Sequence, residues 1–159
     1  LKPKAPQFTG ATKQRWRKTR LVDHASGWFD QGGGDFISKH VYFKKLPRNL
    51  KPDVRRAAII SEFGGYSLKT PGHMWNEAKK YGYRYFNTRE ELTVAYLHLL
   101  QDELEPLIRN GLSSAVYTQT TDVEIEINGY LTYDRTIEKM DAGKLKAAHT
   151  RLFAAAREA

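Results

Sequence analysis

A short apolar run at residues 57–60 constrains the fold more than any other feature of this chain. Ala57-Ala58-Ile59-Ile60 contains no polar residue, and Ser61-Glu62-Phe63-Gly64-Gly65 follows it with one charge and two glycines. A strand that is apolar on both sides is typical of a parallel sheet with both faces covered. The run therefore predicts a buried parallel strand with Glu62 at its carboxyl end.

Helices and further strands are expected around this run. Thr88 and Glu91 have the form of a capping box, and apolar periodicity predicts a helix from 88 to 111, loosened near Pro106. A last helix is expected over 141–157, with these residues on its apolar side: Leu145, Ala148, Leu152 and Phe153. Three other segments are typical of strands: 21–25, 35–42 and 112–117. Strands that alternate with helices indicate an α/β fold, in which chemistry lies at the carboxyl ends of the strands.

The net charge of +8 raises the question of a nucleic-acid partner. The excess gathers in two groups, at residues 2–20 and 44–56, and this distribution is more typical of a solvated surface around loops. Residues 1–19 are expected to form a basic arm or a short helix. No apolar run is long enough to span a membrane. The chain starts at Leu1 and we expect it to be truncated, so the compartment stays unknown; the absence of cysteine does not fix it either.

Several residues near the predicted strand ends have side chains suited to chemistry. Glu62 has a rigid strand behind it and space in front, as a catalytic carboxylate needs, although many strand-end charges are only solvated. His40 and Tyr42 lie two apart on a predicted strand and so face the same side. Trp28 follows a strand as well. These three also fit the simpler interpretation of residues that pack in or cover the core.

No cofactor or metal is indicated. The five histidines do not fall into a ligand pattern such as His-Glu-x-x-His. Gly32-Gly33-Gly34 lacks the Lys-Ser/Thr ending and the following helix of a phosphate-binding loop.

Residues 61–66, Ser-Glu-Phe-Gly-Gly-Tyr, are similar to the nucleophile segment of glycoside hydrolase family 2, which contains β-galactosidases, β-glucuronidases and β-mannosidases. The likeness covers roughly residues 19 to 150, with several motifs in the family's order. These are Thr19-Arg20-Leu21-Val22, Ala25-Ser26-Gly27-Trp28, Gly34-Asp35, His40-Val41-Tyr42, Ala115-Val116-Tyr117-Thr118-Gln119, Asp122-Val123-Glu124, Asn128-Gly129 and Thr132-Tyr133-Asp134-Arg135.

The resemblance implies that residues 20–159 are the C-terminal half, strands five to eight, of a (β/α)₈ TIM barrel, which typically needs about 250 residues. It implies that Glu62 is the nucleophile of a retaining glycosidase. The family's general acid/base belongs to an Asn-Glu pair on the fourth strand, before this chain begins. The only such pair here is Asn76-Glu77, in the loop after Glu62. Four acids of this chain remain open as weaker substitutes for the general acid/base: Glu77, Asp122, Glu124 and Glu126.

The substrate implied is a β-glycoside. Trp28, His40 and Tyr42 are the expected sugar-binding residues, because pyranose rings offer apolar faces to aromatic rings and hydroxyls to polar groups. Tyr66 and Trp75 lie in the long loop 63–86, which is expected to form a wall of the pocket. The family often carries a tryptophan on the eighth strand; here Gln119 is the hydrogen-bonding substitute.

Two other classes of function stay open. A carbohydrate-binding or scaffold protein that kept the barrel without the chemistry would lack the upstream Asn-Glu pair. A nucleic-acid-binding module would show binding with a steep salt dependence; we expect neither a nucleic-acid nor a membrane partner. Because half a barrel leaves two open strand edges, the remainder of the barrel or another copy of the chain is the expected protein partner, and the isolated piece should form a dimer or a larger assembly.

Overall fold

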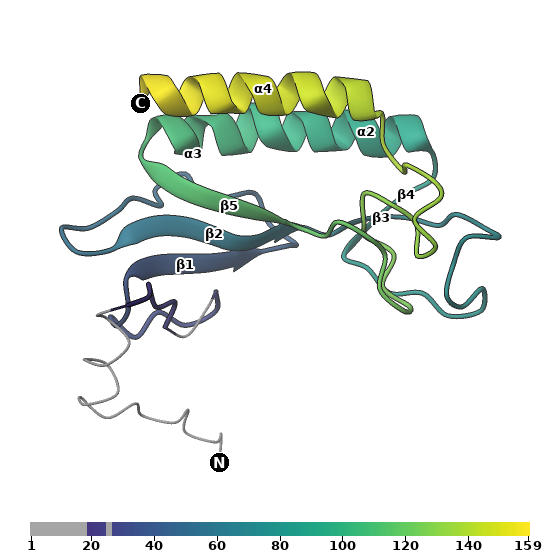
Figure 1. Cartoon of the computed structure of the whole chain (residues 1–159), viewed down its shortest axis with the longest axis horizontal. Helices are drawn as coiled ribbons and strands as arrows, with labels where there is room; N and C mark the ends of the chain where they lie inside the picture. Colours follow the sequence, from purple (N-terminus) through teal and green to yellow (C-terminus); the bar gives the residue numbers. More distant parts are fainter. Residues whose placement is uncertain (1–18, 25–26) are drawn as a thin grey trace, which may run out of the picture.

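The structure is a computed structural model that describes residues 19–24 and 27–159. These residues form an α/β domain with a three-stranded parallel sheet and helices on one of its faces (Figure 1). The strands are β1 (Phe36–Val41), β2 (Ala57–Gly64) and β5 (Leu112–Thr118), with β2 in the centre. The predicted α/β class is confirmed. The arm or helix expected at the N-terminus falls on residues 1–18, outside the described part.

The apolar run forms the core of β2, as predicted. Ala58 and Ile60 are fully buried against the helices. The strand does not end at Ile60, however, and continues to Gly64, so Glu62 lies inside β2, two residues before its end. Gly64 and Gly65 then take positive φ angles of 89° and 62°, which turn the chain away from the sheet.

One continuous helical segment covers the sheet after the loop. It consists of α2 (Arg89–His98), the π-helical η1 (Leu99–Leu104) and α3 (Glu105–Arg109). Thr88 Oγ1 accepts the backbone N–H of Glu91, as the capping box predicts, whereas the Glu91 carboxylate accepts from Asn87 N rather than from Thr88 N. The loosening expected near Pro106 takes the form of wider π-helical turns just before the proline.

The last helix, α4 (Ala142–Glu158), lies beside this segment. Asp141 caps it by accepting a hydrogen bond from Lys144 N at 2.9 Å. Ala148 and Leu152 are buried, as expected, but Phe153 is 70% exposed. The prediction that Phe153 lies on the buried side was wrong. Consecutive residues of an α-helix are separated by about 100° around its axis, so Phe153 points away from the side that Leu152 buries.

The strand predicted at residues 21–25 is absent from the described residues 21–24. Val22 instead makes two hydrogen bonds with Asp35, each 2.8 Å long. Asp35 N donates to the carbonyl oxygen of Val22, and Val22 N donates to the carboxylate of Asp35. Since both bonds involve one residue that precedes β1, no ladder develops. The loop after β2 contains a small parallel pair that the sequence did not indicate, β3 (Tyr66–Leu68) and β4 (Arg84–Phe86).

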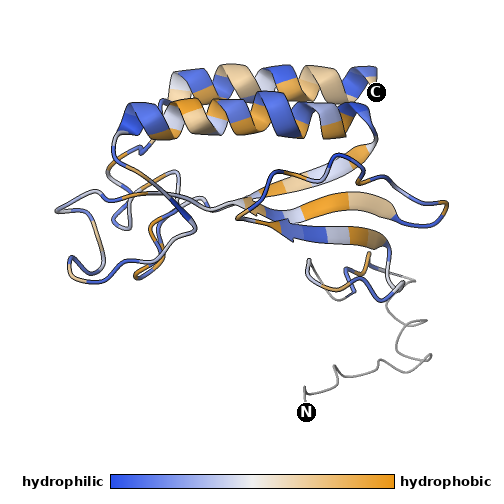
Figure 2. Cartoon of the chain, turned by 180° about the vertical axis from the view of Figure 1, so that it is seen from behind, coloured by the Kyte–Doolittle hydropathy of each residue, from blue (hydrophilic) through white to orange (hydrophobic). Residues whose placement is uncertain are grey.

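Figure 2 shows the hydropathy of these elements, with β2 the most apolar strand and the helices carrying both hydrophilic and hydrophobic residues. The core lies between β2, β5 and the helical layer. Among the helices formed by the described residues, none has the length and apolar character required to cross a lipid bilayer.

Candidate active site at the carboxyl end of the sheet

Three of the predicted site residues meet at the carboxyl ends of β1 and β2. His40 is the register partner of Glu62, and Tyr42 follows the last residue of β1. The Tyr42 hydroxyl donates a hydrogen bond to Glu62 Oε2, and His40 Nδ1 lies 3.3 Å from the same oxygen. Both contacts use Oε2, and no hydrogen bond among the described residues involves the other oxygen, Oε1, which an incoming group can therefore use. The Glu62 side chain is 44% exposed, so a ligand can reach it.

Two residues that sequence reasoning did not single out complete this cluster. Thr118, the last residue of β5, has its Oγ1 3.0 Å from the Tyr42 oxygen. Tyr42 has a single hydroxyl proton and gives it to Glu62, so Thr118 is the donor in this second bond. Tyr83, from the loop after β2, stacks on the Tyr42 ring at 3.8 Å between centroids. Thr118 is therefore the contribution of β5 to the site, and Tyr83 is the contribution of the loop after β2.

The phenols beside Glu62 remain protonated at neutral pH. Burial, followed by the hydrogen bond to Glu62, raises the pKa of Tyr42 well above its usual value. Burial and then the hydrogen bond to Tyr81 raise the pKa of Tyr83 to about 12. Tyr42 is thus a permanent neutral donor to the carboxylate across the whole physiological range. A donor of this kind fixes the direction of the Glu62 carboxylate.

Gly65 makes room for the stacked tyrosines. A Cβ at this position would lie 2.4 Å from Cδ2 of Tyr83 and 3.0 Å from Cδ1 of Tyr42. Gly72 has a similar positive φ of 83°, but among the described residues nothing lies within 4 Å of the point that a Cβ would occupy there. A comparison of alanine substitutions at Gly65 and Gly72 therefore distinguishes the cost of backbone strain from the cost of steric overlap.

We expect Gly65→Ala to destabilise the protein by about 1–3 kcal/mol more than Gly72→Ala, because only the first adds overpacking to the strain of a positive φ. Urea denaturation of the two variants measures the difference. Gly65→Ala should also displace Tyr83 from Tyr42. Equal destabilisation by both variants would mean that the stack is not tightly packed against Gly65.

The remaining predicted site residues fall at different distances from the cluster. Trp28 is 60% exposed and meets the His40 ring edge-on at 5.5 Å, so it flanks the site. Gln119 directly follows Thr118, and its Nε2 donates to Asn128 Oδ1 at 2.8 Å. Both residues lie next to members of the cluster, in positions compatible with substrate contact.

Tyr66 and Trp75 are placed elsewhere. Tyr66 is only 6% exposed and packs in the core against Phe86. Tyr66 is the first residue of β3, and all three residues of that strand are buried. Trp75 is 56% exposed and its ring packs on Tyr133, 5.0 Å away. Neither ring contacts Glu62, His40 or Tyr42 within the described part of the chain.

The four acids considered as substitutes for a second catalytic carboxylate have other contacts. Glu77 is exposed and accepts from Gly72 N. Asp122 is buried in an ion pair with Lys139, at 2.7 Å. Glu124 is exposed, and Glu126 accepts from Asn128 Nδ2 at 2.9 Å. Among the residues described, no hydrogen bond connects any of the four to Glu62.

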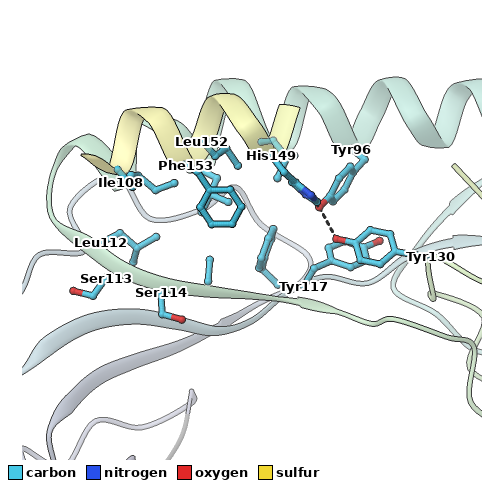
Figure 3. A pocket seen from close by; sticks show the side chains of 15 residues that line it. Tyr96, Ile108, Leu112, Ser113, Ser114, Tyr117, Tyr130, His149, Leu152 and Phe153 are labelled. Carbon is cyan, nitrogen blue, oxygen red and sulfur yellow. Dashed lines mark hydrogen bonds between the residues drawn. The ribbon is translucent and has the colours of Figure 1, made fainter. Parts of the chain in front are cut away.

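An apolar cavity of about 330 Å³ lies away from this site, between β5 and the helices. Figure 3 shows its lining, which includes Leu112, Tyr117, Leu152 and Phe153. At one end the Tyr96 hydroxyl lies 2.8 Å from His149 Nε2 and 2.5 Å from the Tyr130 hydroxyl. Burial lowers the pKa of His149, so this end of the cavity is neutral at physiological pH.

Residues 19–24 and 27–159 contain no group of three or more His, Asp or Glu side chains arranged to hold a metal ion. The chain was also compared with known proteins. No family model matches it, and no curated protein matches it.

Proposed function

We propose that this chain is the nucleophile-bearing part of a retaining β-glycoside hydrolase similar to glycoside hydrolase family 2. The observation that carries the proposal is the half-exposed Glu62 carboxylate at the carboxyl edge of a parallel sheet, held through one oxygen by Tyr42 and His40. A carboxylate that is oriented, hydrogen-bonded and accessible suits nucleophilic attack better than a merely solvated strand-end charge.

In this mechanism Glu62 Oε1 attacks the anomeric carbon of a β-glycoside and forms a glycosyl ester, while the bond to the leaving oxygen breaks. A general acid must protonate that oxygen, and water then hydrolyses the ester. The acid has to lie about 5–5.5 Å from Glu62 in a retaining enzyme. We place this acid outside the 159 residues, as the family's order of motifs implies, because no hydrogen bond among the described residues connects Glu77, Asp122, Glu124 or Glu126 to Glu62.

We further propose that the sheet is part of a TIM barrel completed by other residues of the parent protein. A parallel sheet is normally covered on both faces, whereas here the helices lie on one face (Figure 1). The other face carries small polar groups, among them Ser38 and Ser61, whose hydroxyls are 2.6 Å apart. Within the described residues β5 is an edge strand of the three-stranded sheet, so its outer side is where a further barrel strand would pair.

A panel of p-nitrophenyl β-glycosides, offered to the full-length protein, tests the proposed activity. Release of p-nitrophenol from at least one member, with net retention at the anomeric carbon, is the expected result. Hydrolysis with inversion would exclude a covalent intermediate on Glu62. Binding of the corresponding sugars without any hydrolysis would favour the alternative, a carbohydrate-binding or scaffold protein.

Tyr42→Phe is expected to lower kcat/KM of the full-length enzyme by about 10- to 100-fold, because Glu62 loses its neutral donor while the ring stack with Tyr83 is kept. Steady-state kinetics on the best substrate of the panel measures the loss. Tyr85→Phe is the matched control, since Tyr85 is 46% exposed and lies in β4. Equal kinetics for wild type and Tyr42→Phe would show that the tyrosine hydroxyl does not assist Glu62.

A further inference from the structure

Three side chains after β5 form a hydrogen-bonded relay that ends beside the candidate active site. Gln119 Nε2 donates to Asn128 Oδ1 at 2.8 Å, and Asn128 Nδ2 donates to Glu126 Oε1 at 2.9 Å. Asn128 is fully buried, whereas Gln119 and Glu126 at the two ends are partly exposed. A buried amide with partners on both sides is held in one orientation, because leaving either end unsatisfied is costly.

The carboxylate at one end determines the polarity of the whole relay. A carboxylate only accepts hydrogen bonds, so Asn128 must turn its NH₂ group toward Glu126. Its carbonyl oxygen then faces Gln119, which must donate through its own NH₂ group. The side-chain carbonyl oxygen of Gln119 takes no part in the relay, and it can accept a hydrogen bond from another group.

Backbone hydrogen bonds fix the relay to the segment that directly follows Thr118, the β5 residue of the cluster. Gln119 N donates to Asn128 O at 3.2 Å, and Tyr130 N donates to Gln119 O at 3.0 Å. The residue before Gln119 is Thr118, which donates to the Tyr42 hydroxyl, and Tyr42 donates to Glu62. Gln119 is thus one residue away from a chain of hydrogen bonds that reaches the carboxylate.

The other end of the relay borders the same aromatic group. Tyr81 N donates to Ile125 O at 2.6 Å and Ile127 N donates to Tyr81 O at 3.0 Å, which hold the segment around Glu126 against the loop of Tyr81. After burial and the hydrogen bond to Tyr81, the negative charges of Glu126 and Glu62 also raise the pKa of Tyr83, the ring stacked on Tyr42. Both ends of the relay therefore lie at the edge of the site.

We propose that Glu126 and Asn128 are positioning residues that orient Gln119 so that its carbonyl oxygen accepts a hydrogen bond from one hydroxyl of the sugar at Glu62. This inference rests on the proposed glycosidase function and deepens it, because it assigns the specificity for that hydroxyl to a fixed acceptor. A site with a dedicated acceptor discriminates against an analogue that lacks the matching hydroxyl.

The test uses the full-length protein, the best p-nitrophenyl β-glycoside of the panel and its monodeoxy analogues. The wild type should prefer the parent glycoside over one particular deoxy analogue by about tenfold or more in kcat/KM. Gln119→Met, which keeps the length of the side chain, should lose about tenfold on the parent glycoside and less than about twofold on that analogue. The discrimination for that hydroxyl should therefore disappear.

Glu126→Gln tests the polarity of the relay with almost no change in shape. An amide at this position can accept or donate, so Asn128 and Gln119 lose their single orientation. We expect the discrimination for the same hydroxyl to fall severalfold while turnover of the deoxy analogue is kept. Glu124→Gln, an exposed acid in the same loop, is the matched control and should leave all ratios unchanged.

Different results would contradict different parts of the account. A uniform loss on the parent and on every deoxy analogue, in both Gln119→Met and Glu126→Gln, would mean that the relay only supports the loop, and would overturn the inference alone. Turnover that survives Glu62→Gln, or no turnover of any glycoside by the wild type, would overturn the proposed function and this inference with it.

Discussion

From the proposed glycosidase mechanism, Glu62→Gln is expected to lower kcat of the full-length protein by about 10⁴-fold or more, because the amide is a far poorer nucleophile than the carboxylate it replaces. The substitution keeps the shape of the side chain. The amide carbonyl can still accept the hydrogen bond of Tyr42, so the fold around β1 and β2 should persist. Steady-state and single-turnover kinetics on the best glycoside measure the loss, and thermal denaturation checks that the variant is folded.

Glu77→Gln is the control for this experiment. Glu77 belongs to the only Asn-Glu pair of the chain, but it is exposed and bonds to Gly72 in its own loop. Its replacement should change kcat by less than about threefold, as expected for a surface residue without a role in the transition state. A loss for Glu77→Gln as large as that for Glu62→Gln would instead make Glu77 a candidate for the general acid.

Lys139→Met is expected to destabilise the domain by about 3–5 kcal/mol. Lys139 is fully buried, and its ammonium group donates to Asp122 Oδ1 at 2.7 Å and to Ile127 O at 2.8 Å. Burial raises the pKa of Asp122 and lowers the pKa of Lys139, so each group depends on the other to stay charged. Removing the lysine leaves a buried carboxylate without its counter-ion. Urea denaturation measures the change in the free energy of unfolding.

Two further variants make the stability experiment decisive. Lys144→Met removes an exposed ion pair with Glu90, at 3.1 Å, and should cost less than about 1 kcal/mol. The double variant Lys139→Met/Asp122→Leu removes both buried charges and should recover much of the loss. If Lys139→Met were as mild as Lys144→Met, the buried pair would not contribute to the stability of the loop after β5.

The periodic elements could be predicted from the sequence because their signals are local. The capping box at Thr88 marks the start of the first helix, the apolar spacing of Leu145, Ala148 and Leu152 indicates the last helix, and the apolar run at 57–60 marks β2. The failures have local causes as well. Residues 21–24 have strand-like composition but are tied to Asp35 rather than to a neighbouring strand, and the pairing of β3 with β4 depends on a loop that brings residues 66 and 84 together.

The cluster around Glu62 was only partly predictable. His40 and Tyr42 follow from the alternation of a strand, which places both on the side of Glu62. Tyr83 was one of several aromatic residues in its loop, and no sequence signal distinguishes it from Tyr66, which packs in the core. The difference arises from the path of the loop in three dimensions, which spacing along the chain does not encode.

Covalent trapping tests the central claim most directly. An activated 2-deoxy-2-fluoro-β-glycoside of the preferred sugar destabilises both oxocarbenium-like transition states, while its good leaving group lets the glycosyl ester accumulate. Peptide mapping by mass spectrometry of the inactivated full-length protein should find one sugar on the peptide that contains Glu62, and none in Glu62→Gln. A label on another carboxylate, or turnover without any labelled peptide, would contradict the role of Glu62 as the nucleophile.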